Sequence, residues 1–457
     1  MSSLRLLLAL GAAGAAFASA SASASASASA SASASASASA SASASTPAPA
    51  YAVHALSAAH RRPAAWARTL CGSPSKTPQS DLITQWGAAI TPDSVAAAFG
   101  YPRPQMTRDA ASTFTSLDSL WEFELASSFY DPLPVGRTLN QTILVPFPLE
   151  ACLSGAFRWP AYSTHMFYRL LFDAPAAAGG GGGARTLLHF GAVDYNATVY
   201  LNGVALGAPH LGGYDAFSFD LGVVGEPGAL RAQGNELILR VYDPSDSGVQ
   251  VHGKQKVGAI NGPGGDEYTP SSGIWQTVWL EAVPAGVHIS ELRLRGSATH
   301  LFATVSLGSP GTPALVNGTV SFNGAFVTAF AGAAGEELLV PIPAPQQLWH
   351  PSTPNLYDLA VTVLEPSTGS VDTVASYFGM REVQLLPYTI PGSGGAGSRI
   401  GINGNFTFLA GWLDQSWWPD GEYTAPGDDA LRFDVQGVLD FGMNFVRLHQ
   451  KVNPERW

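Results

Sequence analysis

Five side chains near the end of the sequence have the chemistry needed to bind a sugar. Asp414, Trp417 and Trp418 lie close together, and Arg447 and His449 follow further along the chain. An arginine can hold a carboxylate in its ionised form, while histidine and tryptophan bind hydroxyls and stack on a pyranose face. The alternative is a buried pair between Arg447 and a carboxylate that only fixes the local structure. The first interpretation makes these five residues substrate-binding candidates.

The surrounding sequence predicts a β-α-β unit. Phe406–Ala410 is a short apolar strand, and Asn444–Leu448 is a second one. Between them, Asp428–Phe441 has helical spacing, and Gly442 stands where a glycine commonly ends a helix. The apolar face of the helix is formed by Leu431, Val435, Val438 and Leu439. Such a unit is the building block of a parallel sheet or barrel.

The preceding sequence predicts β-structure throughout. From about residue 112 to 285, short alternating strands separated by Gly- and Pro-rich turns indicate a β-sandwich. Asn202-Gly203 predicts a tight hairpin turn. Residues 286–385 repeat the pattern with about six or seven strands, which suits an immunoglobulin-like sandwich. Residues 387–397 are expected to be poor in strands, and their Gly-Ser-Gly-Gly run to form a linker or surface loop.

The amino terminus resembles a targeting segment. Arg5, the apolar residues 6–17 and the small residues 18–20 predict a signal peptide over 1–20; an alanine-rich start without a targeting role is the alternative. Residues 21–65, rich in Ser, Ala and Pro, are expected to be a low-complexity spacer. We therefore expect a secreted protein or one of the secretory pathway. Four N-glycosylation sequons, weak support for this, begin at Asn140, Asn196, Asn317 and Asn405.

The composition narrows the class of partner. Only 12% of the residues are charged and the formal net charge is −11, which disfavours nucleic acid and anionic membranes and is compatible with a neutral sugar. No cluster with metal-ligand spacing occurs, so we name no metal ligand and expect no cofactor. Cys71 and Cys152 either pair in an oxidising compartment or are incidental, and the sequence leaves this open.

Several motifs together resemble glycoside hydrolase family 2, the group of β-galactosidases, β-mannosidases and β-glucuronidases. The motifs include Leu144-Val-Pro-Phe-Pro-Leu-Glu, Ser272-Gly-Ile-Trp-Gln-Thr-Val-Trp-Leu-Glu, Phe378-Gly-Met-Arg and Gly442-Met-Asn-Phe-Val-Arg-Leu-His. The resemblance runs from about residue 66 to 457. It implies a mainly β fold: a jelly-roll, galactose-binding-like sandwich over 66–285, an immunoglobulin-like sandwich over 286–385, and the first β-α-β unit of an incomplete (β/α)8 barrel over 398–457.

The resemblance also implies an activity, retaining hydrolysis of O-glycosyl bonds of β-linked sugars. Active sites of such barrels lie at the C-terminal ends of the strands, which implies sugar-contacting or site-supporting roles for the five residues named first. The mechanism needs two carboxylates about 5–5.5 Å apart, and the family draws them from the fourth and seventh barrel strands. A full barrel takes about 250 residues, whereas residues 398–457 supply 60. We therefore expect both catalytic glutamates to be absent and this chain to be inactive as given. Asp414, Asp420 and Glu422, all on one loop, are not expected to replace them.

A non-catalytic carbohydrate-binding or scaffold protein is the second function that the sequence allows.

Further expectations concern single residues and loops. Asp194 is expected to order a loop by accepting backbone hydrogen bonds, and a loop with Asp266 and Tyr268 is a further candidate to reach the sugar. Two strands and one helix cannot close a barrel, so exposed apolar faces are expected. The aromatic residues expected to be core rather than sugar platforms are Trp275, Trp279, Phe190 and Phe217.

Overall fold

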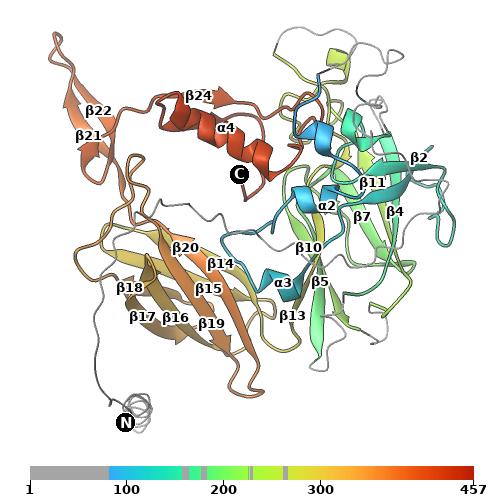
Figure 1. Cartoon of the computed structure of the whole chain (residues 1–457), viewed down its shortest axis with the longest axis horizontal. Helices are drawn as coiled ribbons and strands as arrows, with labels where there is room; N and C mark the ends of the chain where they lie inside the picture. Colours follow the sequence, from blue (N-terminus) through green and yellow to red (C-terminus); the bar gives the residue numbers. More distant parts are fainter. Residues whose placement is uncertain are drawn as a thin grey trace, which may run out of the picture. The chain divides into compact units, whose positions relative to one another are not determined.

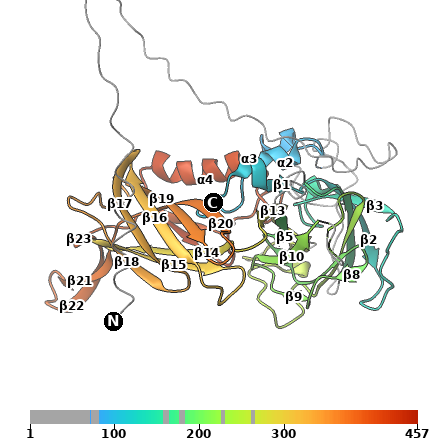
Figure 2. The ribbon, with the colours of Figure 1, turned by 90° about the horizontal axis from the view of Figure 1, so that it is seen from below.

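The computed structural model describes Cys71 and residues 82–156, 164–175, 183–224, 226, 230–260 and 266–457. The predicted signal peptide and spacer lie outside the described residues. Within these ranges no helix is long and apolar enough to cross a membrane. Antiparallel strands dominate the ribbon, as predicted (Figures 1 and 2).

The first group of strands forms two antiparallel sheets around one core. The four-stranded sheet has the order β1 (Phe114–Ser116), β13 (Val278–Pro284), β5 (Ala184–Phe190) and β10 (Phe217–Val223). The seven-stranded sheet contains β3 (Gln141–Leu144), β2 (Leu120–Ala126), β4 (Thr164–Phe172), β11 (Asn235–Asp243), β7 (Asn196–Leu201), β8 (Val204–Ala205) and β9 (His210–Leu211). Two short strands, β6 (Val193–Asp194) and β12 (Gly273–Ile274), pair separately. The predicted Asn202-Gly203 hairpin turn joins β7 to β8, with both residues at positive φ.

A second group of strands, with a separate core, follows. Its three-stranded sheet contains β14 (Ile289–Gly296), β15 (His300–Leu307) and β18 (Glu337–Pro341). Its four-stranded sheet has the order β17 (Ala325–Ala333), β16 (Leu315–Phe322), β19 (Tyr357–Leu364) and β20 (Val371–Phe378). The core between them includes Leu301, Val316, Val361 and Val374.

The expectation of a strand-poor linker or surface loop over 387–397 is confirmed only for residues 390–395, which form an exposed turn; the residues on either side of the turn belong to strands. β21 (Val383–Thr389) and β22 (Ala396–Ile402) pair along their whole length as a hairpin, and β23 (Asn405–Phe406) adds to β22. The glycines form only the turn: Gly392 and Gly394 have positive φ, and Ile390 N donates to Gly395 O at 2.8 Å. Figures 1 and 2 both show this hairpin extending away from the strands that precede it.

The predicted β-α-β unit is present, with one boundary corrected. β24 (Gly411–Asp414) and β25 (Phe445–Leu448) are parallel neighbours joined by α4 (Asp428–Asp440), and Gly442 has a φ of 69°. The first parallel strand is not Phe406–Ala410, because a turn at Asn403-Gly404 with positive φ folds Phe406 back onto β22. Short helices α2 (Val95–Ala98) and α3 (Ala110–Thr113) precede the sheets.

Much of the apolar surface of this unit is exposed. On α4, Leu431 and Val438 are buried, whereas Val435 and Leu439 are exposed. Further exposed apolar side chains of the unit are Leu413, Phe433, Phe441, Phe445 and Leu448. Two strands and one helix thus leave apolar faces uncovered, as expected.

Cys71 and Cys152 form a disulfide, a question that the sequence left open. Their Cα atoms lie 5.1 Å apart, and 81 positions separate them in sequence. The bridge is buried in a small cluster with Ile90, Val95 and Phe147. It therefore ties an early segment of the chain to the loop after β3.

A buried network of ion pairs around Glu281 connects the two groups of strands. Glu281, on β13, accepts from Arg108 Nη1 at 2.7 Å, from His189 Nε2 at 3.0 Å and from Arg103. Arg108 also reaches Asp372 on β20, with Nη2 and Oδ2 2.7 Å apart. Burial alone would raise the pKa of Glu281, but the hydrogen bond from His189 and the two arginine charges hold it well below its usual range. The carboxylate is therefore ionised and fully paired.

Glu281→Gln should destabilise the fold strongly. The substitution leaves two arginines inside the protein with one carboxylate fewer, and breaking a buried pair in this way costs about 3–5 kcal/mol. Unfolding in guanidinium chloride measures the change. The matched control is Glu291→Gln, which breaks an exposed pair with Arg293 and should leave the midpoint unchanged. Equal midpoints for the two variants would show that the network does not stabilise the protein.

Candidate functional site

Asp414 and His449 meet at the C-terminal ends of the two parallel strands. Asp414 is the last residue of β24, and its carbonyl accepts a hydrogen bond from the backbone of His449 at 2.9 Å. The Asp414 carboxylate accepts from Ser416 N at 2.7 Å and Ser416 Oγ at 2.9 Å, which orients it. His449 Nδ1 is buried and has no hydrogen-bond partner within the described part of the chain. The structure thus places an oriented carboxylate and an unpaired ring nitrogen at one strand end.

Trp417 is held by the loop that contains Asp266 and Tyr268. The rings of Trp417 and Tyr268 are stacked, with centroids 4.1 Å apart and planes 15° apart, and Trp417 Nε1 donates to Thr269 O at 3.1 Å. This loop, which precedes β12, therefore does reach the strand-end residues. We call Asp414, Trp417, Tyr268 and His449 the strand-end site.

Trp418 and Arg447, the other two predicted site residues, are not part of the strand-end site. Trp418 is 9% exposed and packs against Ala425, Ala430 and Leu431 in a small apolar cluster. Arg447 is exposed and sits opposite Leu413 in the parallel register. The structure therefore does not contain the buried Arg447–carboxylate pair that was the alternative: three of the four residues of β25, Arg447 among them, are exposed.

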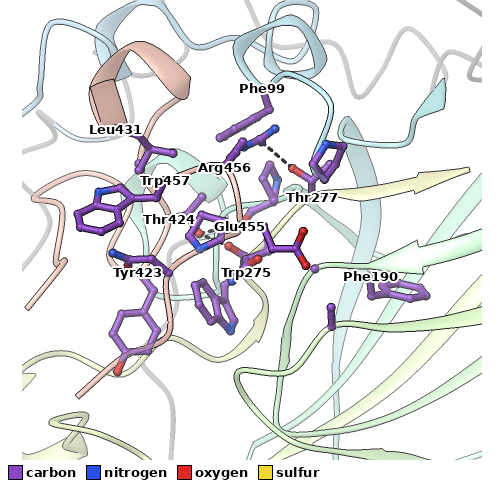
Figure 3. A pocket seen from close by; sticks show the side chains of 18 of the residues that line it. Phe99, Phe190, Trp275, Thr277, Tyr423, Thr424, Leu431, Glu455, Arg456 and Trp457 are labelled. Atoms are coloured by element: carbon purple, nitrogen blue, oxygen red, sulfur yellow. Dashed lines mark hydrogen bonds between the residues drawn. The ribbon is translucent and has the colours of Figure 1, made fainter. Parts of the chain in front are cut away.

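A cavity of about 260 Å³ lies close to this site (Figure 3). Its lining comes from the four-stranded sheet, from segments around Arg103 and Thr277, and from the β-α-β unit and the residues after it, including Leu431 and Trp457. Arg456 Nη2 donates to Thr277 Oγ1 at 3.1 Å across it. Trp418 also lines the cavity, whereas the strand-end site does not.

The prediction that four aromatic residues belong to the core is confirmed only in part. Phe190 lies in the main core and Phe217 packs against it. Trp275 and Trp279 are 1% and 3% exposed, so they are buried as expected, but both lie outside the main core, and all four residues line the cavity. Burial was predictable from residue type; the surface that each ring contacts was not.

Lys451 is a site residue that sequence reasoning missed. Its Nζ donates to Ser416 O at 2.9 Å and to Tyr423 O at 3.0 Å, which pins the loop carrying Trp417. Burial lowers the pKa of Lys451 to about 7, although Asp414 and Asp434 oppose the shift. Its position two residues after His449 was the available signal, but spacing alone did not distinguish it from a solvated lysine.

Glu150 and Asp194 are two further buried carboxyl groups. Glu150 Oε2 accepts from Ser272 N at 2.8 Å, and Asp194 Oδ2 accepts from Gln255 Nε2 at 2.9 Å. The expectation that Asp194 accepts backbone hydrogen bonds is thus corrected: its partner is a side-chain amide. Burial raises the pKa of Glu150 to about 8, and the nearby Asp243 adds to the shift. Glu150 is therefore protonated in the folded chain at neutral pH.

Stability should fall as pH rises through this range. The unfolded Glu150 carboxyl has a pKa near 4.5 and the folded one about 8, so its contribution is complete below pH 4.5 and disappears towards pH 8. Glu150→Gln, which is neutral at every pH, should flatten the decline of Tm measured between pH 5 and pH 8. The exposed Glu336→Gln serves as control and should keep the wild-type slope. A wild-type slope in the Glu150 variant would contradict the assignment.

The described chain is thus a mainly β protein that ends in a β-α-β unit with polar and aromatic residues at its strand ends. A family model described as "Glycosyl hydrolases family 2" matches residues 304–381, from β15 to just past β20. The resemblance to glycoside hydrolase family 2 seen in the sequence is confirmed by this match and by the relatives that follow.

Two curated proteins are similar in sequence. The chain is 27% identical over 285 residues to a putative β-glucuronidase of Formosa agariphila, covering 59% of this chain and 30% of that protein. It is 25% identical over 347 residues to β-mannosidase B of Thermothelomyces thermophilus, covering 66% of this chain and 38% of that protein. The chain thus spans about a third of the length of these relatives.

Solved β-glucuronidase structures share the fold. For the enzyme of Bifidobacterium dentium the TM-score is 0.57 at 21% identity, covering 76% of this chain and 58% of that chain. For the enzyme of Ruminococcus gnavus it is 0.58 at 18% identity, covering 78% and 59%. At these identities the likeness concerns the fold alone.

Proposed function

We propose that this chain is the front part of a retaining β-glycosidase of the family 2 type, which hydrolyses O-glycosyl bonds of β-linked sugars. The observation that carries the proposal is the strand-end site: Asp414 and His449 are joined across two parallel strands, beside a Trp417 ring held by a loop from the first group of strands. Carboxylate, imidazole and indole are groups that bind sugar hydroxyls and stack on a pyranose face.

The domain organisation is part of the proposal. We assign residues 66–285 to a jelly-roll, galactose-binding-like sandwich, 286–385 to an immunoglobulin-like sandwich, and 398–457 to the start of a (β/α)8 barrel. The exposed Leu413, Phe445 and Leu439 support the last assignment, because the further strands and helices of a barrel would cover such faces.

The catalytic carboxylates are proposed to come from later barrel strands. Asp420 is 1% exposed and accepts from Thr84 N and Thr84 Oγ1, both at 2.8 Å, so its carboxylate is engaged in packing the loop. Glu422 is buried, and its pKa is raised well above the usual range by burial and by the neighbouring Glu150. These contacts support the view that neither acid serves as a nucleophile. Asp414, Trp417, Trp418, Arg447 and His449 keep their proposed substrate-binding roles.

We further propose that the protein passes through the secretory pathway. A disulfide between Cys71 and Cys152 suits an oxidising compartment. Three of the four sequon asparagines, Asn140, Asn317 and Asn405, are exposed and open to glycosylation.

A second candidate function is a non-catalytic carbohydrate-binding protein. The cavity favours it, because Trp275, Trp279 and Trp418 line a hollow formed without any of the later barrel strands. The two candidates differ in whether a chain extended by the later strands cleaves glycosides.

The 457-residue chain should bind sugars without cleaving them. Purified protein incubated with nitrophenyl β-glucuronide, β-galactoside and β-mannoside should release no nitrophenol above the blank, because in this proposal the two carboxylates of a retaining site come from later barrel strands. Turnover that survives repurification, and is lost on Asp414→Asn, would overturn the assignment of the catalytic groups to later strands.

Trp417→Ala should weaken sugar binding at the strand-end site. Loss of an aromatic stacking surface should reduce the affinity for a methyl β-glycoside roughly threefold or more, measured by isothermal titration calorimetry. Trp412→Ala removes an equally half-buried indole that packs on Phe441 instead, and it should bind like the wild type. The same affinity in both variants would remove Trp417 from the site.

A further inference from the structure

A second cavity lies in the second group of strands and is separate from the strand-end site. Its volume is about 620 Å³, and its lining includes the end of β14, the end of β20 and the start of β21. None of the residues of the strand-end site lines it. We call it the arginine cavity, because Arg295 and Arg381 both belong to its lining.

Strand alternation places Arg295 on the outer face of β14. Leu292 and Leu294 pack against the second core, so Arg295 points the other way, and its side chain is exposed. Phe302 on β15 stands opposite Arg295 in the register, and the guanidinium carbon lies 3.7 Å from the centroid of its ring. A guanidinium that stacks on a ring keeps its N–H donors in its own plane, where they can still bind other groups.

Arg381 is held in the same way. Met380 is buried in the second core, whereas the next residue, Arg381, is exposed. The guanidinium carbon of Arg381 lies 4.6 Å from the centroid of the Trp349 ring. Trp349 N donates to Met380 O at 2.8 Å, which ties the backbone of Trp349 to the segment that carries the arginine. Both guanidinium groups are thus supported by an aromatic ring.

Two glycines bring the arginines to one place. A Cβ atom at Gly296 would collide with the carbonyl oxygen of Gly379, so the two backbones touch at this point. Gly296 directly follows Arg295, and Gly379 precedes Arg381 by two positions. Both glycines also line the cavity. The close approach of the two backbones therefore gathers the two arginines in one lining.

The cavity carries an excess of positive charge. Neither Arg295 nor Arg381 forms an ion pair or a hydrogen bond with any residue that the structure describes. Glu382, the acid in the lining, already accepts from Gln384 Nε2 at 2.8 Å and from Ala298 N at 3.4 Å. Two arginines thus face one glutamate, although the whole chain has a net charge of −11. Unpaired guanidinium groups are suited to a carboxylate or sulfate, which can accept two N–H bonds at once.

Other residues of the lining suit the hydroxyl groups of a sugar. Gln105, Gln384 and Tyr377 line the same cavity. Amide and phenol groups both donate and accept hydrogen bonds, and an aromatic ring offers apolar surface to the C–H face of a pyranose. A free inorganic anion would use the arginines alone. The combined lining therefore matches a sugar that carries an acidic group.

We propose that the arginine cavity binds an acidic sugar, with Arg295 and Arg381 donating to its carboxylate or sulfate group. The site belongs to the second group of strands and needs neither the strand-end site nor a catalytic carboxylate. It therefore goes beyond the proposed hydrolysis and does not depend on it.

The direct test is Arg295→Gln in the full chain, titrated calorimetrically with methyl β-D-glucuronide at low salt. Loss of a charge-assisted hydrogen bond should weaken the affinity roughly tenfold, and added NaCl should weaken binding to the wild type. The matched control is Arg399→Gln: the Arg399 guanidinium carbon lies 3.1 Å from the centroid of the Tyr388 ring but outside the cavity, so this variant should bind like the wild type. Equal affinities in the two variants would exclude the arginine cavity as the binding site.

A variant that gains affinity guards against misfolding of the first. Glu382→Gln removes the negative charge but keeps an oxygen acceptor for Gln384 Nε2, so it should bind the glucuronide more tightly than the wild type does. Methyl β-D-glucoside, which lacks the carboxylate, should show no binding that depends on Arg295. Unchanged affinity in Glu382→Gln, or Arg295-dependent binding of the glucoside, would refute the role of charge. Sodium sulfate that binds as tightly as the glucuronide would show a site for free oxyanions and would also contradict the acidic sugar.

The two site proposals can fail independently. The wild type should bind glucuronide at two places, one weakened by Trp417→Ala and the other by Arg295→Gln. Binding that responds only to Trp417→Ala would remove the arginine cavity and keep the strand-end site. Binding that responds only to Arg295→Gln would do the reverse.

Discussion

The fully buried carboxylate of Glu281 is the constraint on which the arrangement depends. An ionised group without solvent is stable only when donors surround it, and here Arg103, Arg108 and His189 do so. The two arginines bring the segment before β1 across the outer face of the sheet, and Arg108 continues to Asp372 in the second group of strands. The Glu281 carboxylate thus holds the segment before β1 on the four-stranded sheet, and Arg108 links both to the second group of strands through Asp372.

The same constraint prepares the cavity. Side chains alternate along a strand, so Trp279 must share the face of Glu281, two positions away. The network then occupies His189 Nε2 and the end of Arg103, while Trp279 Nε1 and Arg103 Nε have no hydrogen-bond partner among the residues that the structure describes. The cavity wall formed by Trp279 and His189 is therefore a consequence of how the buried carboxylate is satisfied.

The strand-end site is held from outside the β-α-β unit. Trp417 stacks on Tyr268, and Lys451 binds the carbonyls on both sides of the loop, at Ser416 and Tyr423. A loop with so many anchors keeps Trp417 in one orientation, which a stacking surface requires.

The sequence by itself determined local elements: the Asn202-Gly203 turn and helix α4 with Gly442 at its end follow from neighbouring residues. The β21–β22 hairpin was missed because its glycines look like a linker until the flanking strands pair. Only the tertiary structure decided that Cys71 meets Cys152, that Arg447 is exposed and that Trp279 lines a cavity. These outcomes depend on contacts such as Arg108 with Asp372, 264 positions apart, and no local period specifies which distant side chain completes a buried charge.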